Sequence, residues 1–116
     1  MGRLSTHVLD TLAGRPAAGL TVELHRLHSA DSTLLRAAVT DADGRTGPLL
    51  EGPQFTPGRY SLTFHAATYF RGCGVALPQP PFLEEVVISF GVAHPDQNWH
   101  VPLVMTPWSY STYRGS

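Results

Sequence analysis

Tyr60-Ser61-Leu62-Thr63-Phe64-His65 is the stretch that decides the fold. Large apolar side chains at positions 60, 62 and 64 alternate with polar ones at 61, 63 and 65, which is typical of a β-strand with one buried face. Outward from this stretch, similar short runs recur between turn residues such as Asp43-Gly44 and Pro80-Pro81. The pattern predicts a protein built mainly from short strands.

The predicted elements are short and evenly spaced along the chain. Strands are expected over residues 4–12, 20–27, 34–40, 60–65, 85–90, 99–105 and 109–113, with a short strand over 46–50. Residues 13–16 are expected to turn, and one short helix is expected over 66–71, ending at Gly72. Seven or eight strands with almost no helix predict an antiparallel β-sandwich.

Length and charge restrict the class of protein. The 116 residues, 42% of them hydrophobic, fit a single domain spanning residues 1–116 with a substantial core. A net charge of -1 argues against a nucleic-acid-binding protein, which would show a basic patch or stripe. The chain contains no lysine, so catalysis through a lysine Schiff base is excluded.

The sequence shows no targeting signal that we recognise, and it contains a single cysteine. The beginning of the chain does not resemble a signal peptide, because charged and polar residues interrupt it, and no apolar run approaches the 18 or so residues that cross a bilayer. A soluble cytoplasmic protein without membrane contact is therefore expected. Cys73 is the single cysteine, which precludes an intrachain disulfide, and its glycine neighbours favour a small buried filler over a nucleophile.

Three side chains are candidates for chemistry. His7 and His100 each lie in a predicted strand, and a sandwich can place both on one sheet face, where a histidine near its ordinary pKa can act as a general base. Arg45 follows the Asp43-Gly44 turn and could hold a planar anion or a polarised carbonyl. The alternatives are half-buried polar histidines, a solvated turn arginine, or a zinc site built from both histidines.

The stretch Tyr110-Ser111-Thr112-Tyr113-Arg114-Gly115-Ser116 alternates aromatic and small hydroxyl residues, which suits a last β-strand. A strand that finishes there can hold a phenol, a guanidinium, a serine hydroxyl and the α-carboxylate at one fixed place. The alternative is an edge strand that contributes nothing to a site.

Five stretches together resemble the 5-hydroxyisourate hydrolases, the transthyretin-related enzymes of purine catabolism. They are Leu4-Ser5-Thr6-His7-Val8-Leu9-Asp10, Asp43-Gly44-Arg45-Thr46, Gly58-Arg59-Tyr60, His100-Val101-Pro102-Leu103 and Tyr110 to Ser116. The closing Tyr-Arg-Gly-Ser is the most specific, because it separates these enzymes from transthyretin, the hormone carrier of similar fold. The sequence departs from the family at Trp99, where another aromatic such as tyrosine is usual.

The resemblance implies a transthyretin-like sandwich of two four-stranded sheets with one short helix, assembled as a homotetramer. It implies hydrolysis of 5-hydroxyisourate to 2-oxo-4-hydroxy-4-carboxy-5-ureidoimidazoline in urate degradation, with no cofactor and no metal. His7, Arg45 and His100 correspond to the family's catalytic residues. Tyr113, Arg114, Gly115 and Ser116 correspond to its substrate-binding terminal motif. The alternative from the same resemblance is a transthyretin-type carrier of a small ligand without catalysis.

Overall fold

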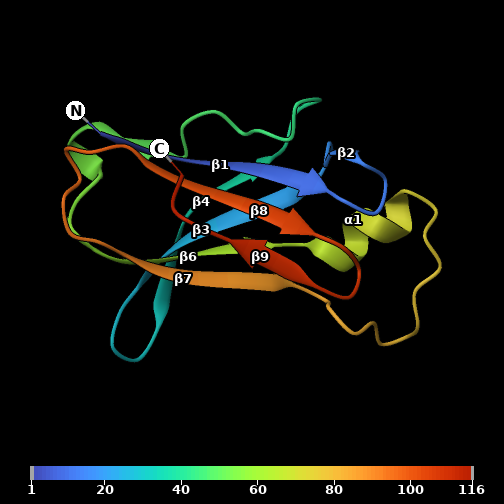
Figure 1. Ribbon diagram of the computed structural model, residues 1–116. Helices are drawn as coiled ribbons and strands as arrows, with labels where there is room; N and C mark the ends of the chain where they lie inside the picture. Colours follow the sequence, from blue (N-terminus) through green and yellow to red (C-terminus); the bar gives the residue numbers. More distant parts are fainter. Residues whose placement is uncertain (1, 116) are drawn as a thin grey trace.

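Two β-sheets enclose an apolar core in the computed structural model, which describes residues 2–115 (Figure 1). The five-stranded sheet contains β1 (Arg3–Asp10), β2 (Arg15–Pro16), β5 (Leu50–Glu51), β8 (Trp99–Met105) and β9 (Tyr110–Thr112). The four-stranded sheet contains β3 (Thr21–Leu27), β4 (Ser32–Val39), β6 (Gly58–Phe64) and β7 (Val86–Val92). A 3-10 turn, η1 (Gly52–Gln54), and the helix α1 (Ala66–Gly72) complete the structure.

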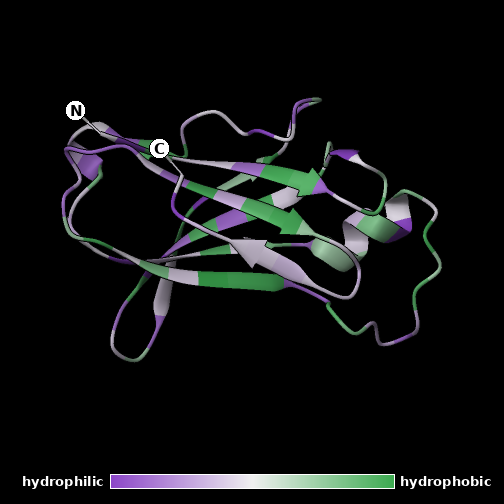
Figure 2. Cartoon of the chain, viewed as in Figure 1, coloured by the Kyte–Doolittle hydropathy of each residue, from purple (hydrophilic) through white to green (hydrophobic). Residues whose placement is uncertain are grey.

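Alternation along the strands builds the core as the sequence predicts. Tyr60, Leu62 and Phe64 of β6 are fully buried. In β1 the even-numbered residues face inward, and in β8 the odd-numbered residues from 101 onward do the same. Figure 2 shows the consequence in β1 and β8, whose final portions are hydrophobic while their beginnings are more polar. The outward-facing residues at those beginnings are therefore available for a site.

The sandwich prediction is confirmed, with two differences in detail. β1 and β8 pair in parallel, with Ser5 opposite His100, whereas every other strand pair is antiparallel in the described part of the chain. One sheet has five strands rather than four because the two-residue β5 pairs with the beginning of β1. Alternation reveals which face of a strand is buried, but it carries no information on the direction of its neighbour.

Local predictions were confirmed at the helix and wrong at three places. The helix over residues 66–71 is α1. The strand over 46–50 was wrong, because Gly47 at φ +71° and Pro48 interrupt it and only the two-residue β5 forms. Residues 15–16, expected to turn, pair with β1 as β2. Cys73 was expected to be buried and is exposed, because it follows the last residue of α1 and the buried side of that helix is formed by earlier residues such as Tyr69 and Phe70.

A buried hydrogen bond fastens α1 to the five-stranded sheet. Tyr69 Oη donates to Asp10 Oδ2 at 2.8 Å, and the Ala13 backbone N–H donates to Asp10 Oδ1 at 3.0 Å. Asp10 is only 2% exposed. Burial, followed by the hydrogen bond to Asp10, raises the pKa of Tyr69 well above its usual range. Among residues 2–115, no helix has the length and apolar character needed to cross a membrane.

Candidate active site

The site begins where two parallel strands begin. Arg3, Ser5 and His7 alternate with buried residues along β1, so their side chains share the outer face of the five-stranded sheet. His100, the second residue of β8, lies directly opposite Ser5 in the parallel register. The pairing therefore brings two histidines that are 93 positions apart in sequence onto one small area of the sheet.

Ser5 fixes the orientation of His100. Its Oγ lies 2.8 Å from His100 Nδ1, so Nε2 is the ring nitrogen left to face a reactant. Burial lowers the pKa of His100 below its ordinary value, and the positive charge of Arg45 and the neighbouring His7 lower it further. All three effects disfavour the imidazolium form. His100 is consequently neutral and able to accept a proton at neutral pH.

A tight turn delivers Arg45 to β1. The Asp41 carboxylate accepts the backbone N–H groups of Asp43 and Arg45 at 2.9 and 3.1 Å. Gly44 adopts φ +78°, and a Cβ there would lie 2.4 Å from the Val8 carbonyl oxygen, so only glycine fits. The Gly44 carbonyl accepts the Val8 N–H at 2.9 Å. These contacts hold Arg45 beside His7, with which it forms an isolated antiparallel bridge.

The segment after β9 closes the other side of the site. The Gly115 N–H donates to the His100 carbonyl at 2.8 Å, in a bridge that extends the β8–β9 pairing. A Cβ at Gly115 would lie 2.7 Å from His100 Cδ2, so the tail backbone packs directly against the imidazole. Thr112 Oγ1 donates to the Pro102 carbonyl at 2.7 Å and secures the end of β9.

These groups border one open hollow with a volume of about 470 Å³. It is lined by Arg3, Ser5, His7, Arg45, Asn98, His100, Tyr113 and Gly115. Five of the residues singled out from the sequence therefore meet: both histidines, Arg45, Tyr113 and Gly115. Arg114 does not join them, because its side chain lies over the Trp99 ring. Ser116, also predicted for this site, lies outside the described residues.

Sequence reasoning missed Arg3, Ser5 and Asn98 as residues of the hollow. A signal for each was present, because side chains two positions apart in a strand share a face. Ser5 precedes His7 by two residues, and Asn98 precedes His100 by two. Arg3 lies a further two residues before Ser5. The polar character of this face follows directly from that spacing.

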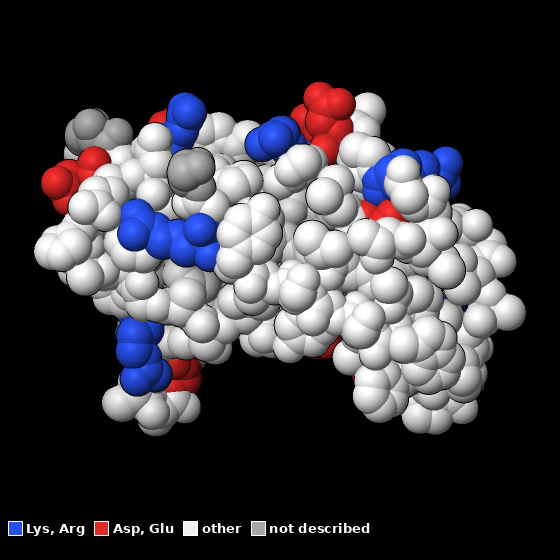
Figure 3. All heavy atoms as spheres, viewed as in Figure 1, with Lys and Arg blue, Asp and Glu red and all other residues white. Residues whose placement is uncertain are grey.

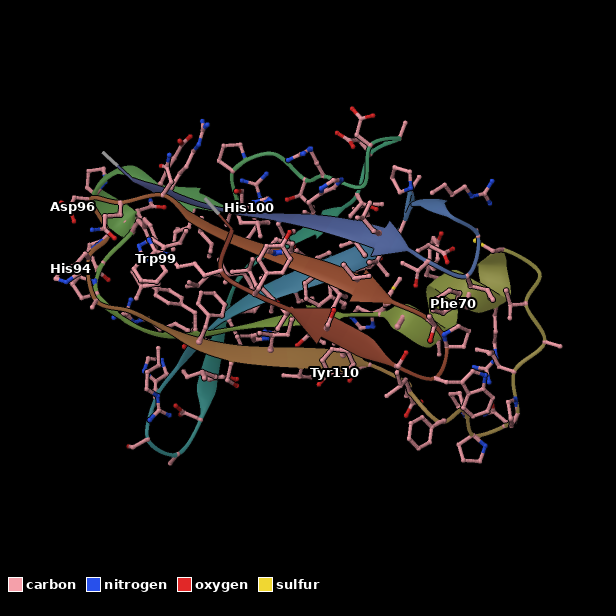
Figure 4. The ribbon with its side chains drawn as sticks, viewed as in Figure 1. Phe70, His94, Asp96, Trp99, His100 and Tyr110 are labelled. Carbon is pink, nitrogen blue, oxygen red and sulfur yellow. The ribbon has the colours of Figure 1, made fainter. Side chains whose placement is uncertain are left out.

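Arg3 and Arg45 supply the permanent charges in the lining of the hollow. On the view in Figure 3, uncharged residues cover most of the surface, and the arginines form small separate groups rather than one basic stripe. Figure 4 shows His100 on the other side of β8 from Trp99. No group of three or more His, Cys, Asp or Glu side chains suited to a metal ion occurs within residues 2–115. The hollow offers a neutral imidazole, a second imidazole and the guanidinium groups of Arg3 and Arg45, which are the groups needed for proton transfer beside a developing negative charge.

The sequence is similar to those of known proteins over nearly its whole length. The model of the HIUase/Transthyretin family matches residues 4–115. A protein of Rhizobium meliloti named 5-hydroxyisourate hydrolase 2 is 55% identical over 99% of this chain and 97% of its own. The 5-hydroxyisourate hydrolase of Pseudomonas aeruginosa is 50% identical over 100% of this chain and 93% of its own.

Solved structures share the fold closely. The 5-hydroxyisourate hydrolase of Klebsiella pneumoniae superimposes with a TM-score of 0.84 at 34% identity, covering both chains completely. An (S)-allantoin synthase gives a TM-score of 0.93 at 44% identity, covering 99% of this chain and 44% of that one. Sea bream transthyretin in complex with thyroxine gives 0.86 at 28% identity, covering 97% of this chain and 94% of its own.

Proposed function

The chain belongs to the HIUase/Transthyretin family, and from that premise we propose that its hollow is the active site of a 5-hydroxyisourate hydrolase. The enzyme opens the six-membered ring of 5-hydroxyisourate with water and yields 2-oxo-4-hydroxy-4-carboxy-5-ureidoimidazoline, a step in urate degradation. The observation that carries the assignment is the convergence on one hollow of five residues: His7, Arg45, His100, Tyr113 and Gly115.

The dimensions and polarity of the hollow support a small, amide-rich substrate. Its volume of about 470 Å³ falls within the roughly 300–1,000 Å³ typical of small-molecule sites. Side chains that donate and accept hydrogen bonds, such as those of Ser5, Arg45 and Asn98, line it. A planar heterocycle with several carbonyl and N–H groups can satisfy them.

In the proposed mechanism His100 is the general base. This role requires the tautomer whose Nδ1–H donates to Ser5 Oγ, 2.8 Å away, so that Nε2 removes a proton from the attacking water. The oxygen of that water forms a bond to the ring carbonyl carbon, and the carbonyl electrons move onto its oxygen. Collapse of this intermediate breaks the C–N bond, and the leaving nitrogen receives a proton from an imidazolium. His7 lines the same hollow and shares that proton transfer in this mechanism.

Arg45 provides the positive charge that this mechanism requires. Its guanidinium is permanently positive, so it stabilises the oxyanion that develops in the transition state. The same charge lowers the pKa of His100 and keeps the base unprotonated. Tyr113 and the tail backbone fix the edge of the substrate and exclude bulk water.

A carrier of the transthyretin type is the second candidate, because a sea bream transthyretin solved in complex with thyroxine has a similar fold. A carrier channel requires mostly apolar lining. The hollow here is lined chiefly by charged and polar side chains, and the more similar relatives are named as hydrolases. Both observations favour the enzyme.

We further propose that the enzyme works as a homotetramer whose subunits cover each other's hollows. Arg45 is exposed, and Tyr113 is 61% exposed in the single chain. A hydrolytic site in which the water must be positioned benefits from a second surface that excludes bulk solvent. A neighbouring copy would supply that surface.

The direct test uses 5-hydroxyisourate generated in place from urate by a urate oxidase. The ultraviolet absorbance of 5-hydroxyisourate decays slowly without an enzyme, and the purified protein is expected to accelerate that decay in proportion to its concentration. Decay at the spontaneous rate, with the protein folded, would contradict the proposed function. Fluorescence or calorimetric binding of thyroxine without such acceleration would favour the carrier instead.

A further inference from the structure

The side chain of Arg114 points away from the hollow into a socket of its own. We propose that Arg114 is a positioning residue that locks the tail against His100, and that it does not bind the substrate. This inference rests on the function proposed above, and it departs from the expectation that all of residues 113–116 contact the substrate.

Three contacts define the socket. The Arg114 guanidinium lies 3.8 Å from the centroid of the Trp99 ring, a cation–π arrangement. Arg114 Nη2 also donates to Gln97 Oε1 at 3.1 Å and to the Asn98 carbonyl at 3.2 Å. A planar guanidinium can stack and donate in its plane at the same time, which an ammonium cannot do. The socket therefore suits arginine in particular.

The socket is itself held in place. Trp99 Nε1 donates to the His94 carbonyl at 2.8 Å, and the Gln97 N–H donates to the same oxygen at 3.1 Å. Gly2 packs so tightly against this loop that a Cβ there would lie 1.9 Å from the Gln97 carbonyl oxygen. Figure 4 shows Trp99 with His94 and Asp96 at this end of the sandwich. Arg114 thus docks onto a fixed surface.

Alternation along the extended tail explains how the socket acts on the site. Tyr113 and Gly115 line the active-site hollow and Arg114 does not. Arg114 borders a second, apolar hollow of about 230 Å³ where the edges of the two sheets approach, and Tyr113 lies between the two hollows and borders both. Side chains on either side of an extended residue point the opposite way. Docking of Arg114 therefore turns Tyr113 toward the substrate and presses Gly115 against the His100 ring.

Without this anchor the tail would be weakly held. Beyond β9, the backbone bond from Gly115 to the His100 carbonyl fixes it, and strand ends fray readily. The Trp99 indole has a double importance in this arrangement, because it precedes His100 on β8 and carries Arg114 on its face. Trp99 therefore links Arg114 to the strand that carries His100.

A double-mutant cycle on kcat/KM tests the inference. Arg114→Ala is expected to lower kcat/KM by about tenfold to 10²-fold, the scale of a misplaced active-site group. In a Trp99→Leu background, where the platform is gone, the same substitution should cost little more. If Arg114→Ala causes the same loss with and without Trp99, the arginine acts on the substrate directly and the inference is wrong.

A spectroscopic measurement tests the socket independently of catalysis. The chain has two tryptophans, so Trp108→Phe leaves Trp99 as the single indole. In that protein Arg114→Ala should shift the Trp99 emission and increase its quenching by iodide, whereas Arg36→Ala, which removes an exposed charge from β4, should do neither. Unchanged emission would overturn the inference even in an active hydrolase. Changed emission in a protein without hydrolase activity would instead overturn the proposed function and leave the socket intact.

Discussion

At the level of single residues, the neighbours of His100 set the orientation of its ring and its pKa. Ser5 orients its ring, burial and then the charges of Arg45 and His7 lower its pKa, and Gly115 packs against its edge. These neighbours come from three separate stretches of the chain: Ser5 and His7 from β1, Arg45 from just after the Asp43-Gly44 turn, and Gly115 from the tail. The properties of the base are therefore set by its surroundings rather than by histidine itself.

Gly115→Ala should impair the enzyme more than its small size suggests. The new Cβ would fall 2.7 Å from His100 Cδ2, so either the ring or the tail must move. We expect kcat/KM to fall about tenfold or more, the usual penalty for a displaced catalytic group. Gly72→Ala is the matched control, because a Cβ at Gly72 meets nothing within 4 Å. Equal activity of the two variants would show that the tail does not constrain His100.

Removal of the Arg45 charge should change the pH dependence in a defined direction. Burial, and after it the positive charge of Arg45, lower the pKa of His100 below its ordinary value of 6.5. Its base form is therefore lost only as the pH falls through that lowered pKa. In Arg45→Gln the pKa should rise toward 6.5, which moves the acid limb of kcat/KM to higher pH.

The pH prediction can be checked without activity by NMR titration of the His100 ring protons. Arg36→Gln, which removes a distant charge, is the control. The difference between the variants should shrink at high salt, since Arg45 is exposed and its charge is screened. A His100 pKa that stays the same or falls in Arg45→Gln would contradict the proposed electrostatic role.

At the level of elements, most of the strands could be predicted and their neighbours could not. The strand over 99–105 and the helix after His65 follow from alternation and turn chemistry, and both form as expected. The parallel pairing of β1 with β8 is a long-range choice that no local pattern records. Short strands such as β5 also escape prediction, because two residues have no periodicity.

The link between α1 and β1 predicts a stability effect. Tyr69→Phe removes a hydrogen-bond donor from the buried Asp10 carboxylate, which should lower the free energy of unfolding by about 1–3 kcal/mol. Urea denaturation measures this change. Tyr110→Phe, at a residue 45% exposed on β9, should alter stability by no more than about 0.5 kcal/mol. Equal stabilities would mean that the Tyr69–Asp10 contact makes no net contribution.

At the level of the whole molecule, the site arises because two polar strand beginnings, one turn and one tail meet at the same end of the sandwich. Residue type and position in the sequence indicated His7, Arg45, His100 and the closing stretch with Tyr113 and Gly115, and family resemblance gave them their roles. It could not indicate the outward turn of Arg114, which depends on contacts with a loop 16 and 17 residues away. Ser5 could have been predicted as a site residue, because it lies two positions before His7 in the same strand and shares its face.

The proposed homotetramer has a measurable consequence. Light scattering is expected to give four times the chain mass of 12.6 kDa. Dilution below the dissociation range should lower activity per subunit, because Arg45 and Tyr113 would lose their cover. A monomer with full activity would contradict the shared-site arrangement.

The most direct test of the central claim compares the wild-type protein with His100→Asn in the decay of 5-hydroxyisourate absorbance. Asparagine preserves a polar side chain but cannot accept the proton from water. The account predicts that wild-type protein accelerates the decay strongly and that His100→Asn reduces the rate by about 10²–10⁴-fold with its fold intact. A variant that retains near wild-type activity would show that the base lies elsewhere and would contradict the account.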